Sequence, residues 1–536
     1  MCEMESNTTH LKSNGRDTSR SSDYRQLYQS IHTETHQPTP AKIKGEVPKW
    51  INGSLYRNGP GLFEVGKQKV ESFFDGFALL HKFIIKDGTV SYQSRYLECD
   101  AYKLAQSEQR LVLGTFGTAI HRDPCKSYFR HLFSYFKKPM YDPTDNCNVN
   151  WLDLGNDELY ALTESNLLCK VDPETLKVTD KIDIMDYVAV NSATAHPHYG
   201  EDGVVYNMGS SFGFRSNYNI IKMVKAKKGD NANPLETATV LCSIPASTCN
   251  PAYFHSFALT KNYVVFLEQP FNVNVLKILT CKLREVAMSS SLEFHPNEKC
   301  RFHIVNIHTG HLITTKYLAD SFFCFHFINA YEDQGHVVVD LCSYNDDTII
   351  KYATLESTRS GGASSLEGSL RPVRFVLPLI LDGNSDKLVT LADSLATAKL
   401  VGKDTVMCTP EVLCEEGTFE LPQINYNSYN GRPYRYAYGV VTHHLRQISK
   451  IDIKTKSRVL WGSESGSCYP SEPVFVPNPN GVDEDDGVVL SLVTDVSPPT
   501  KSTFLVVLDG KTLEEVARAE VKDLPFGIHG MFVNST

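Results

Sequence analysis

Short runs rich in β-branched and aromatic residues recur along almost the whole chain, each bounded by Gly, Asn, Asp or Pro. Clear examples are Gly203 to Tyr206, Tyr263 to Leu267, His336 to Asp340, Gly487 to Ser491 and Thr503 to Leu508. Strands of this length, without regular helical stretches between them, are typical of all-β sandwiches, barrels and propellers. Because closed all-β folds can run long as one domain, the length of 536 residues favours a propeller.

One short pattern is repeated: a strand ends in an apolar residue, Asp follows, and a turn closes on Thr. It is found in Leu168 to Thr175, Ile448 to Thr455 and Leu505 to Thr512, and in Phe302 to Thr309 with Asn306 in place of the Asp. These segments begin at residues 168, 302, 448 and 505, as expected for steps of roughly two, two and one units of a 60- to 70-residue blade. Strand–Asp–turn sequences are common in any β protein, so the repeat supports a propeller only modestly.

Composition limits the partners and the compartment. A net charge of −9 and a pI near 6.1 weigh against nucleic acid as a partner, since phosphate binding needs clustered Lys and Arg. No run of about 18 apolar residues is present, so a membrane-spanning helix is not expected. The 14 cysteines include no Cys-x-x-Cys pair, which suits reduced thiols and a cytoplasmic location.

The chain divides into two parts by composition. Residues 1–40 begin with a stretch rich in Ser, Thr, Asn and charge that lacks the apolar segment of a secretory signal. We expect them to form a disordered polar tail and lead-in segment. Residues 41–536 are expected to form a single propeller domain.

Two stretches break the β pattern with helical spacing. Residues 128–141 place four apolar side chains at i, i+3, i+4 and i+7, namely Phe129, Leu132, Phe133 and Phe136. In residues 271–288, the apolar side chains of Val275, Ile278 and Leu279 have helical spacing, and basic residues lie beside them. Each stretch is either a helix packed on the core or an interfacial helix that dips into a membrane surface. Two such stretches favour peripheral membrane association.

Cys125 lies just before the first of these stretches. Palmitoylation there would strengthen attachment to a membrane. An unmodified thiol is an equally good interpretation of the same residue.

Four histidines lie in otherwise hydrophobic, strand-rich surroundings: His196, His255, His326 and His529. A single histidine in such a setting is usually a hydrogen-bonded core residue. None of the four has the i, i+4 spacing of a helical metal site, so they can meet only where a closed fold brings distant strands together, as a propeller does at its axis. Neutral imidazoles suit Fe(II), Zn, Cu and Ni, so residue type alone does not choose the metal.

A cupin is the competing fold for the first histidine. His196 and His198 are followed by Glu201, which resembles a cupin ligand set. The spacing to Glu201 is short for a cupin, and the chain is far longer than one cupin barrel. The cupin therefore ranks well below the propeller.

Histidine ligands are normally oriented through their second ring nitrogen, often by a carboxylate. Three glutamates in apolar or proline-bounded contexts could serve in this way: Glu164, Glu420 and Glu472. For each, the alternative is a strand-end or turn carboxylate that faces water. The acidic run 483–486 is most simply a solvated turn, because it lacks the EF-hand pattern.

Eight short motifs are shared, in the same order, with one known family. They are GSLYRNGPG from Gly53, FDG from Phe74, DPCK from Asp123, TAHPH from Thr194, FHSF from Phe254, ELPQINY from Glu420, YPSEP from Tyr469 and EDDGV from Glu484. Over nearly everything after the tail, the chain resembles the animal carotenoid cleavage oxygenases. That family includes the β-carotene oxygenases, the insect isomerising oxygenase and the retinal pigment epithelium isomerase.

The resemblance implies a seven-bladed β-propeller with a helical and loop cap over an axial Fe(II). It maps the iron ligands to the four histidines and the carboxylates that orient them to Glu164, Glu420 and Glu472, which leaves His196 without one. His198 would be a neighbour of the site. Where several vertebrate relatives have Phe-His-His, this chain has Phe325-His326-Phe327, which should keep the site and make its surroundings more apolar.

The resemblance further implies O2 and an apolar carotenoid as substrates. Four neutral imidazoles would leave Fe(II) dicationic and open to O2, and a polyene arriving from a membrane would lie beside it in an aromatic tunnel. Candidates for the tunnel lining are Phe116, Thr163 and Tyr344, for which ordinary core packing is the alternative.

The leading function is cleavage of β-carotene-like carotenoids at the central 15,15′ double bond to retinal, and the insect members suggest an accompanying trans-to-cis isomerisation. The alternatives are eccentric 9′,10′ cleavage and retinyl-ester isomerohydrolysis, which consumes no O2. A carotenoid-binding protein without catalysis is disfavoured because all four candidate ligands are present.

Overall fold

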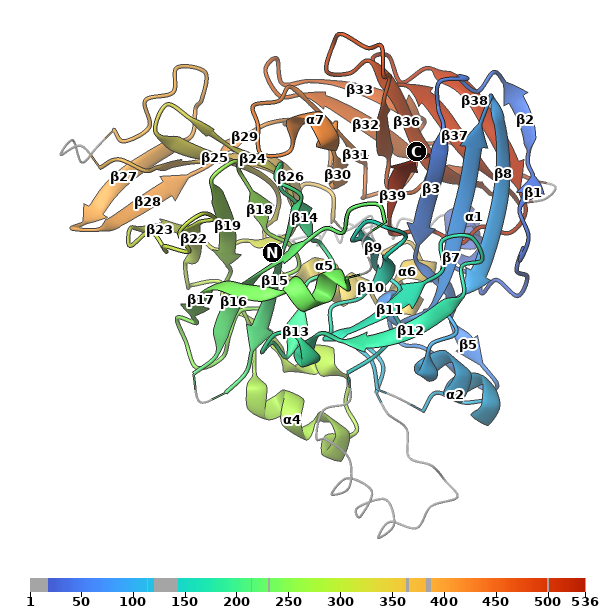
Figure 1. The fold of residues 1–536 in the computed structure, drawn as a ribbon, viewed down its shortest axis with the longest axis horizontal. Helices are drawn as coiled ribbons and strands as arrows, with labels where there is room; N and C mark the ends of the chain where they lie inside the picture. Colours follow the sequence, from blue (N-terminus) through green and yellow to red (C-terminus); the bar gives the residue numbers. More distant parts are fainter. Residues whose placement is uncertain are drawn as a thin grey trace, which may run out of the picture.

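The structure, a computed structural model, describes residues 18–112, 114–119, 143–213, 215–229, 232–362, 366–381, 387–498 and 501–535. Within these residues the strands form seven antiparallel-rich sheets of four or more strands, arranged around a common centre (Figure 1). The predicted seven-bladed β-propeller is confirmed. We number the blades along the chain and call the strand at the central end of each sheet its inner strand.

The first four blades follow the chain from the N-terminal side. Blade 1 contains β3 (Gly53–Asn58), β7 (Phe77–Lys86), β8 (Thr89–Tyr96) and β1 (Thr39–Pro40), with β4 (Pro60–Leu62) beside β7. Blade 2 contains β9 (Asn150–Asp153), β10 (Leu159–Leu162), β11 (Leu167–Val171) and β12 (Val178–Asp183). Blade 3 contains β13 (Ser192–Ala193), β14 (His198–Tyr199), β15 (Val204–Ser211), β16 (Asn217–Val224) and β17 (Thr239–Pro245). Blade 4 contains β18 (Ala258–Leu259), β19 (Tyr263–Glu268), β22 (Cys300–Asn306) and β23 (Lys316–Ala319), extended by β28 (Thr405–Thr409) and β27 (Thr397–Gly402).

The last three blades complete the ring. Blade 5 contains β24 (Phe323–Asp333), β25 (His336–Tyr344), β26 (Leu370–Pro378) and β29 (Glu411–Val412). Blade 6 contains β30 (Glu420–Gln423), β31 (Tyr436–Val440), β32 (Gln447–Asp452) and β33 (Ser457–Gly462). Blade 7 contains β34 (Cys468–Pro470), β35 (Val474–Pro477), β36 (Gly487–Asp495), β37 (Ser502–Asp509) and β38 (Glu515–Val521). Two short ribbons pair β5 (Glu64–Val65) with β6 (Gln68–Lys69) and β20 (Phe271–Val273) with β21 (Leu292–Phe294).

Strands from the two ends of the chain close the ring. The last described strand, β39 (His529–Asn534), pairs with β3 and becomes the inner strand of blade 1, with His529 opposite Asn58. The early strand β2 (Lys42–Gly45) pairs with β38 at the outer edge of blade 7. Both closures are antiparallel ladders, so each of these blades combines segments from opposite ends of the sequence.

The repeated strand–Asp–turn pattern is the turn that follows β11 in blade 2, β22 in blade 4, β32 in blade 6 and β37 in blade 7. In blade 7, for example, the Asp509 carboxylate accepts hydrogen bonds from the Thr512 backbone N–H at 2.8 Å and from its hydroxyl at 3.2 Å. The residue after each Thr has a positive φ, at Leu176, Lys456, Leu513 and Gly310. The spacing of the repeat therefore reports the spacing of the blades.

Apolar side chains fill the space between the faces of neighbouring blades. Between blades 1 and 7, for instance, Leu55 and Phe83 pack in one buried cluster with Leu490, Leu505 and Val507. Sheets that are covered on both faces need apolar residues at successive positions, which explains the nearly continuous burial along β37.

Helices and short 3₁₀ segments lie outside the blades. They are α1 (Thr18–Leu27), α2 (Asp100–Glu108), α4 (Val275–Arg284), α5 (Thr348–Tyr352), α6 (Leu355–Arg359), α7 (Tyr426–Tyr429), η1 (Phe73–Asp75), η2 (Ile184–Asp186), η3 (Pro234–Thr237) and η4 (Met288–Ser291). Among the described residues, no helix combines the length and the apolar character that crossing a bilayer requires.

Within the predicted polar tail and lead-in segment, several apolar residues pack in a buried cluster of the propeller. Tyr24, Leu27, Tyr28 and Ile31 are buried, and the Ile31 N–H donates to the Gly61 carbonyl at 2.8 Å. These four apolar residues have the i, i+3, i+4, i+7 spacing of a helix with one buried face. Most of the residues around them are polar, so the composition of this segment does not indicate a buried face.

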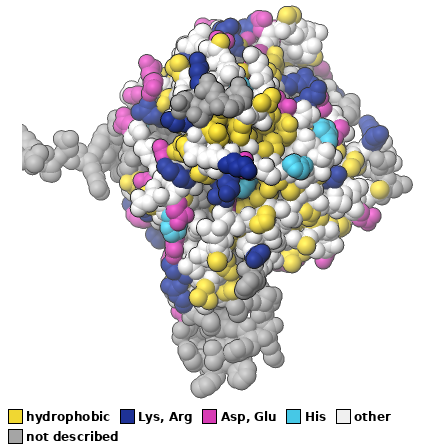
Figure 2. Space-filling view, turned by 90° about the vertical axis from the view of Figure 1, so that its left-hand side faces the viewer, with side chains coloured by type: hydrophobic (Ala, Val, Ile, Leu, Met, Phe, Trp, Pro, Cys, Tyr) yellow, Lys and Arg dark blue, Asp and Glu magenta, His cyan; other side chains and the backbone are white. Residues whose placement is uncertain are grey.

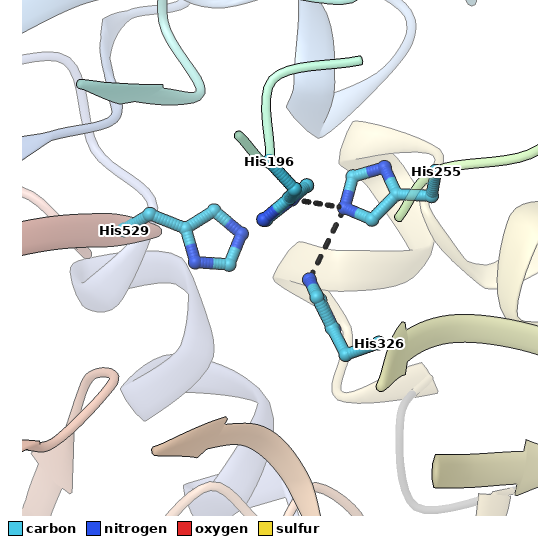
Figure 3. Close-up of side chains that lie close together, drawn as sticks. All are labelled: His196, His255, His326 and His529. Atoms are coloured by element: carbon cyan, nitrogen blue, oxygen red, sulfur yellow. Dashed lines mark hydrogen bonds between the residues drawn. The ribbon is translucent and has the colours of Figure 1, made fainter. Parts of the chain in front are cut away.

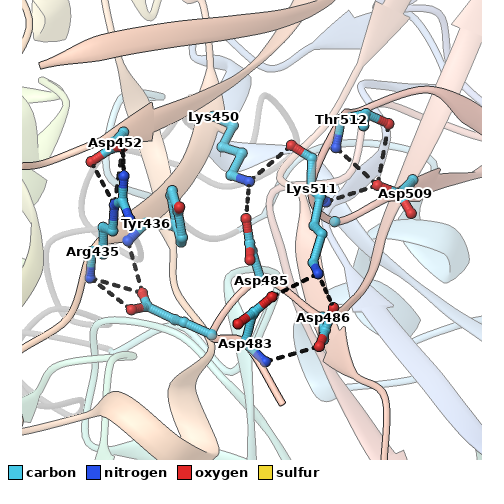
Figure 4. A network of polar contacts seen from close by, with 12 residues as sticks. Arg435, Tyr436, Lys450, Asp452, Asp483, Asp485, Asp486, Asp509, Lys511 and Thr512 are labelled. Atoms are coloured by element: carbon cyan, nitrogen blue, oxygen red, sulfur yellow. Dashed lines mark hydrogen bonds and ion pairs between the residues drawn. The ribbon is translucent and has the colours of Figure 1, made fainter. Parts of the chain in front are cut away.

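The acidic run 483–486 is also not simply a solvated turn. Asp485 is buried and forms an ion pair with Lys450 at 2.5 Å, and the Lys450 ammonium lies 4.1 Å from the centre of the Tyr436 ring (Figure 4). Asp483 is 65% exposed and pairs with Lys511 at 2.8 Å. Since Lys450 is on β32 and Asp485 precedes β36, the buried pair joins blades 6 and 7.

We expect Asp485→Ala to destabilise the fold by about 3–5 kcal/mol, because it leaves the Lys450 ammonium buried without its counter-charge. Asp483→Ala removes only an exposed ion pair, and its expected cost is below about 1 kcal/mol. Thermal and urea unfolding of the two variants and the parent protein test this contrast. Equal loss of stability in the two variants would contradict a special role for the buried pair.

Candidate metal centre

The structure brings together the four histidines that the sequence singled out, although they come from four different blades. His196 lies between β13 and β14 of blade 3, His255 immediately before β18, His326 within β24, and His529 at the start of β39. One nitrogen of each ring lies within 4.8 Å of the corresponding nitrogen of every other ring. Figure 3 shows the four rings pointing toward one centre from different directions.

Each of the three predicted glutamates holds one of these rings. Glu164 contacts His255 Nδ1 at 2.5 Å, Glu420 contacts His326 Nδ1 at 2.6 Å, and Glu472 contacts His529 Nδ1 at 2.8 Å. The glutamates come from the three blades that supply no histidine: blade 2 between β10 and β11, blade 6 at the start of β30, and blade 7 between β34 and β35. Every blade therefore contributes one residue to the site.

These carboxylates determine which ring nitrogen carries the proton. A carboxylate accepts hydrogen bonds, so Nδ1 of His255, His326 and His529 must be the N–H donor, and each Nε2 then presents a lone pair. The Nε2 atoms of His255 and His196 are 2.8 Å apart, and those of His255 and His326 are 3.1 Å apart. His529 Nε2 is buried and has no hydrogen-bond partner among the described residues. Lone pairs that converge in this way repel one another unless a cation lies between them, so the donor set fits a metal ion.

The local charge fits a dication. Burial, together with the neighbouring His255, His529 and His326, holds the pKa of His196 well below its usual range, so this ring is neutral. Three ionised glutamates carry three negative charges, and one of them is paired with the guanidinium of Arg57 at 2.8 Å. The remaining two negative charges would be balanced by one divalent metal ion.

His196 and His198 differ in their surroundings. Among the described residues, no carboxylate hydrogen-bonds to the His196 ring, as the resemblance implied. Both ring nitrogens of His198 are engaged elsewhere, Nδ1 with the Tyr426 hydroxyl at 2.9 Å and Nε2 with the Phe257 carbonyl at 3.0 Å. His198 therefore supports the fold beside the site and does not point into it.

Two residues that hold the carboxylates were not found from the sequence. Arg57, on β3, is 1% exposed and donates a hydrogen bond to Glu472. The Tyr253 hydroxyl donates a hydrogen bond to Glu164 at 2.9 Å. Arg57 could have been chosen from the sequence as a candidate, because it lies inside the motif GSLYRNGPG. Only its position two residues before His255 distinguishes Tyr253 in the sequence.

Three of the four histidines, His255, His326 and His529, border a largely apolar cavity of about 580 Å³, within the size range of small-molecule sites. All three predicted tunnel residues, Phe116, Thr163 and Tyr344, line it. The Tyr344 hydroxyl also donates to Glu420 at 3.0 Å, so this side chain both lines the cavity and fixes a carboxylate.

The residues predicted to contact a membrane are placed only in part. Val275, Ile278 and Leu279 on α4 line the cavity. Phe129, Leu132, Phe133 and Phe136, and also Cys125, lie outside the described residues.

Comparison with known proteins agrees with this geometry. A family model described as retinal pigment epithelial membrane protein matches residues 28–534. Carotenoid-cleaving dioxygenase, mitochondrial, from Mustela putorius furo is 42% identical over 519 residues, which cover 93% of this chain and 94% of the relative. Beta,beta-carotene 15,15′-dioxygenase from Rattus norvegicus is 41% identical over 93% of this chain and 90% of its own length.

The fold is shared with solved structures at lower identity. The cobalt-substituted Synechocystis apocarotenoid oxygenase is similar with a TM-score of 0.76 and 23% identity, over 96% of this chain and 99% of that chain. The match to the family model and the alignments with the two relatives each cover more than nine-tenths of the sequence. The chain therefore belongs to the retinal pigment epithelial membrane protein and carotenoid oxygenase family.

Proposed function

We propose that the protein is a non-haem Fe(II) dioxygenase that cleaves β-carotene-like carotenoids at the central 15,15′ double bond to give retinal. The observation that carries the proposal is the convergence of four histidine nitrogens beside an apolar cavity, with His255, His326 and His529 on its wall. The names of the Mustela putorius furo and Rattus norvegicus relatives describe carotenoid cleavage, which supports the same class of reaction.

Four neutral imidazoles favour a borderline metal such as Fe(II), and the set contains no thiolate that would favour a structural zinc. Fe(II) bound by these residues would supply the redox chemistry that makes O2 reactive. The protein contributes ring orientation, because the three carboxylates fix the Nδ1–H tautomer without adding charge at the metal. The carboxylates are occupied in this task and are not available as general bases.

The cavity wall would place the substrate. Phe325 lies 5.0 Å from the His255 ring and 6.4 Å from the Phe74 ring, measured between ring centres. Flat apolar rings of this kind exclude water and pack against a polyene without competing hydrogen bonds. Which double bond is cleaved would then depend on how far the polyene extends past the histidines.

Eccentric 9′,10′ cleavage and retinyl-ester isomerohydrolysis stay as alternatives, as does trans-to-cis isomerisation accompanying cleavage. The identities of 42% and 41% to the two named relatives are too close to separate the cleavage positions. Dependence on O2 separates both cleavage reactions from isomerohydrolysis.

The cleavage test follows directly from this distinction. Purified protein loaded with Fe(II) is incubated with β-carotene under air and under argon, and the products are separated by chromatography. We expect retinal in air and none under argon; longer apocarotenals would indicate eccentric cleavage, and the isomer composition would report accompanying isomerisation. The absence of any aldehyde in air with iron bound would contradict the oxygenase proposal.

Metal binding can be measured without turnover. After anaerobic addition of Fe(II) and removal of excess metal, elemental analysis is expected to find one iron per chain in the parent protein and almost none in His326→Ala. Glu420→Gln should weaken binding about 10- to 100-fold, because the His326 ring loses its carboxylate partner. His198→Gln is the matched control and should retain one iron. Full loading of His326→Ala would contradict the ligand assignment.

We also propose peripheral membrane association through α4 and a cytoplasmic location. Leu276 on α4 is 72% exposed, whereas its neighbours Val275, Ile278 and Leu279 line the cavity, so this helix could lie between a membrane and the cavity. Figure 2 shows apolar side chains beside Lys and Arg on the face that it turns toward the viewer. The stretch 128–141 and palmitoylation of Cys125 stay predictions of the same kind. Cell fractionation tests the compartment, since the Mustela putorius furo relative is named as mitochondrial.

Leu276→Glu is expected to reduce flotation of the protein with anionic lipid vesicles at least several-fold, since it places a charge in the proposed contact. Leu395→Glu is the control, because Leu395 is similarly exposed, at 76%, on another part of the surface. Unchanged flotation of Leu276→Glu, or equal reduction in both variants, would contradict a contact through α4.

A further inference from the structure

The segment that carries His196 is a bulge in the inner part of blade 3. Both β13 and β14 pair with β15, but their registers differ, so that four residues, 194–197, stand opposite two residues, 207 and 208. Extra residues in one strand of a pair bend that strand and change the direction of its side chains. Here the bulge directs His196 to the other three histidines (Figure 3).

A buried hydroxyl and a buried amide hold this bulge. Thr194 and Asn207 are each 4% exposed. The Thr194 Oγ1 atom accepts the His196 backbone N–H at 3.0 Å and donates its own proton to Asn207 Oδ1 at 2.9 Å. The Asn207 side-chain NH2 group donates to the Thr194 carbonyl at 2.9 Å, and the Met208 N–H donates to Asn207 Oδ1 at 2.8 Å. Since Oδ1 must be the acceptor for Met208, the orientation of the amide is fixed.

Two further constraints act on the same main chain. The Asn150 side chain donates to the Ala195 carbonyl at 2.9 Å, which attaches the bulge to blade 2. Pro197 follows His196, and the residue before a proline is restricted to extended conformations. The main chain on both sides of His196 is therefore fixed, whereas no carboxylate among the described residues holds its ring.

The other three histidines show the opposite arrangement, because glutamates hold their rings at Nδ1. A fourth glutamate at His196 would add another negative charge to the site, and the neutral side chains of Thr194 and Asn207 add none. Because a histidine side chain is short, the position of the His196 ring depends on the position of its main chain. Fixing the main chain is therefore a second way to place a ligand.

We propose that Thr194 and Asn207 are positioning residues, which hold His196 in place as a metal ligand through its main chain. They perform for His196 the task that the glutamates perform for the other histidines through the ring nitrogens. The inference rests on the proposed metal site, since it assumes that His196 is a ligand.

Co(II) is the probe for this inference, because its visible absorption depends on the number and arrangement of its ligands. Metal-free protein is titrated with Co(II) without oxygen, and the dissociation constant and the spectrum at saturation are recorded. Thr194→Val keeps the shape of the side chain but removes the hydroxyl that holds the His196 N–H. We expect Co(II) to bind about tenfold more weakly, with a spectrum shifted toward that of His196→Ala, which lacks the ligand.

A second variant and two controls complete the experiment. Asn207→Asp keeps the acceptor atoms but loses the donor to the Thr194 carbonyl, and it should change the spectrum in the same direction. Thr194→Ser keeps the hydroxyl and should retain the parent spectrum and affinity. Thr503→Val is the control for stability, because Thr503 on β37 is also buried, at 3% exposed, and donates to the Val521 carbonyl at 2.7 Å. It should leave the Co(II) spectrum unchanged.

Parent-like spectra and affinities in both Thr194→Val and Asn207→Asp would overturn the inference, and so would an equal spectral change in Thr503→Val. In these cases the parent protein still binds Co(II), so the proposed metal site stands. A parent protein that binds no Co(II) would instead contradict the metal site itself, and the inference with it.

Discussion

The hydrogen bonds from three histidine Nδ1–H groups to three glutamates are the interactions on which the site depends. They place the proton on the outer nitrogen of His255, His326 and His529 and leave the inner nitrogen of each as an acceptor, so that three lone pairs converge beside the His196 ring. The glutamates are themselves fixed by Arg57, Tyr253 and Tyr344. A seven-bladed ring is what allows all of these residues to reach the axis, because sequence neighbours in a strand cannot converge in this way.

The position of the proton on each imidazole ring also distinguishes this centre from a second histidine cluster. His443, His444 and Glu464 also bring possible ligand atoms within 4.8 Å of one another. The Thr418 oxygen already accepts two backbone N–H groups, so its own proton points to His443 Nδ1 at 3.1 Å, and the Arg446 N–H donates to His444 Nδ1 at 3.1 Å. Both Nε2 atoms then carry the proton and have no lone pair for a metal. Proximity of ligand atoms is therefore not sufficient, and hydrogen-bond direction decides.

Much of the fold could be predicted from strand length and from the turn that closes on Thr, because both depend on local sequence. The four histidines could be named as candidates, but only the family resemblance selected them together, since no local spacing relates His196 to His529. Tyr24, Leu27, Tyr28 and Ile31 had helical spacing, yet the polar residues around them concealed it. Asp485 and Arg57 were missed for a common reason: a charged residue is buried only when a distant partner such as Lys450 or Glu472 meets it, and the sequence does not show that partner.

Ring closure by β39 also constrains the order in which the protein can be completed. His529 is on the last described strand, and that strand finds its place only by pairing with β3 from the other end of the chain. During synthesis, six blades and three of the four histidines can emerge before the final ligand exists. A tightly bound metal would therefore mark a chain in which β39 has paired with β3, and would then hold that closure in place.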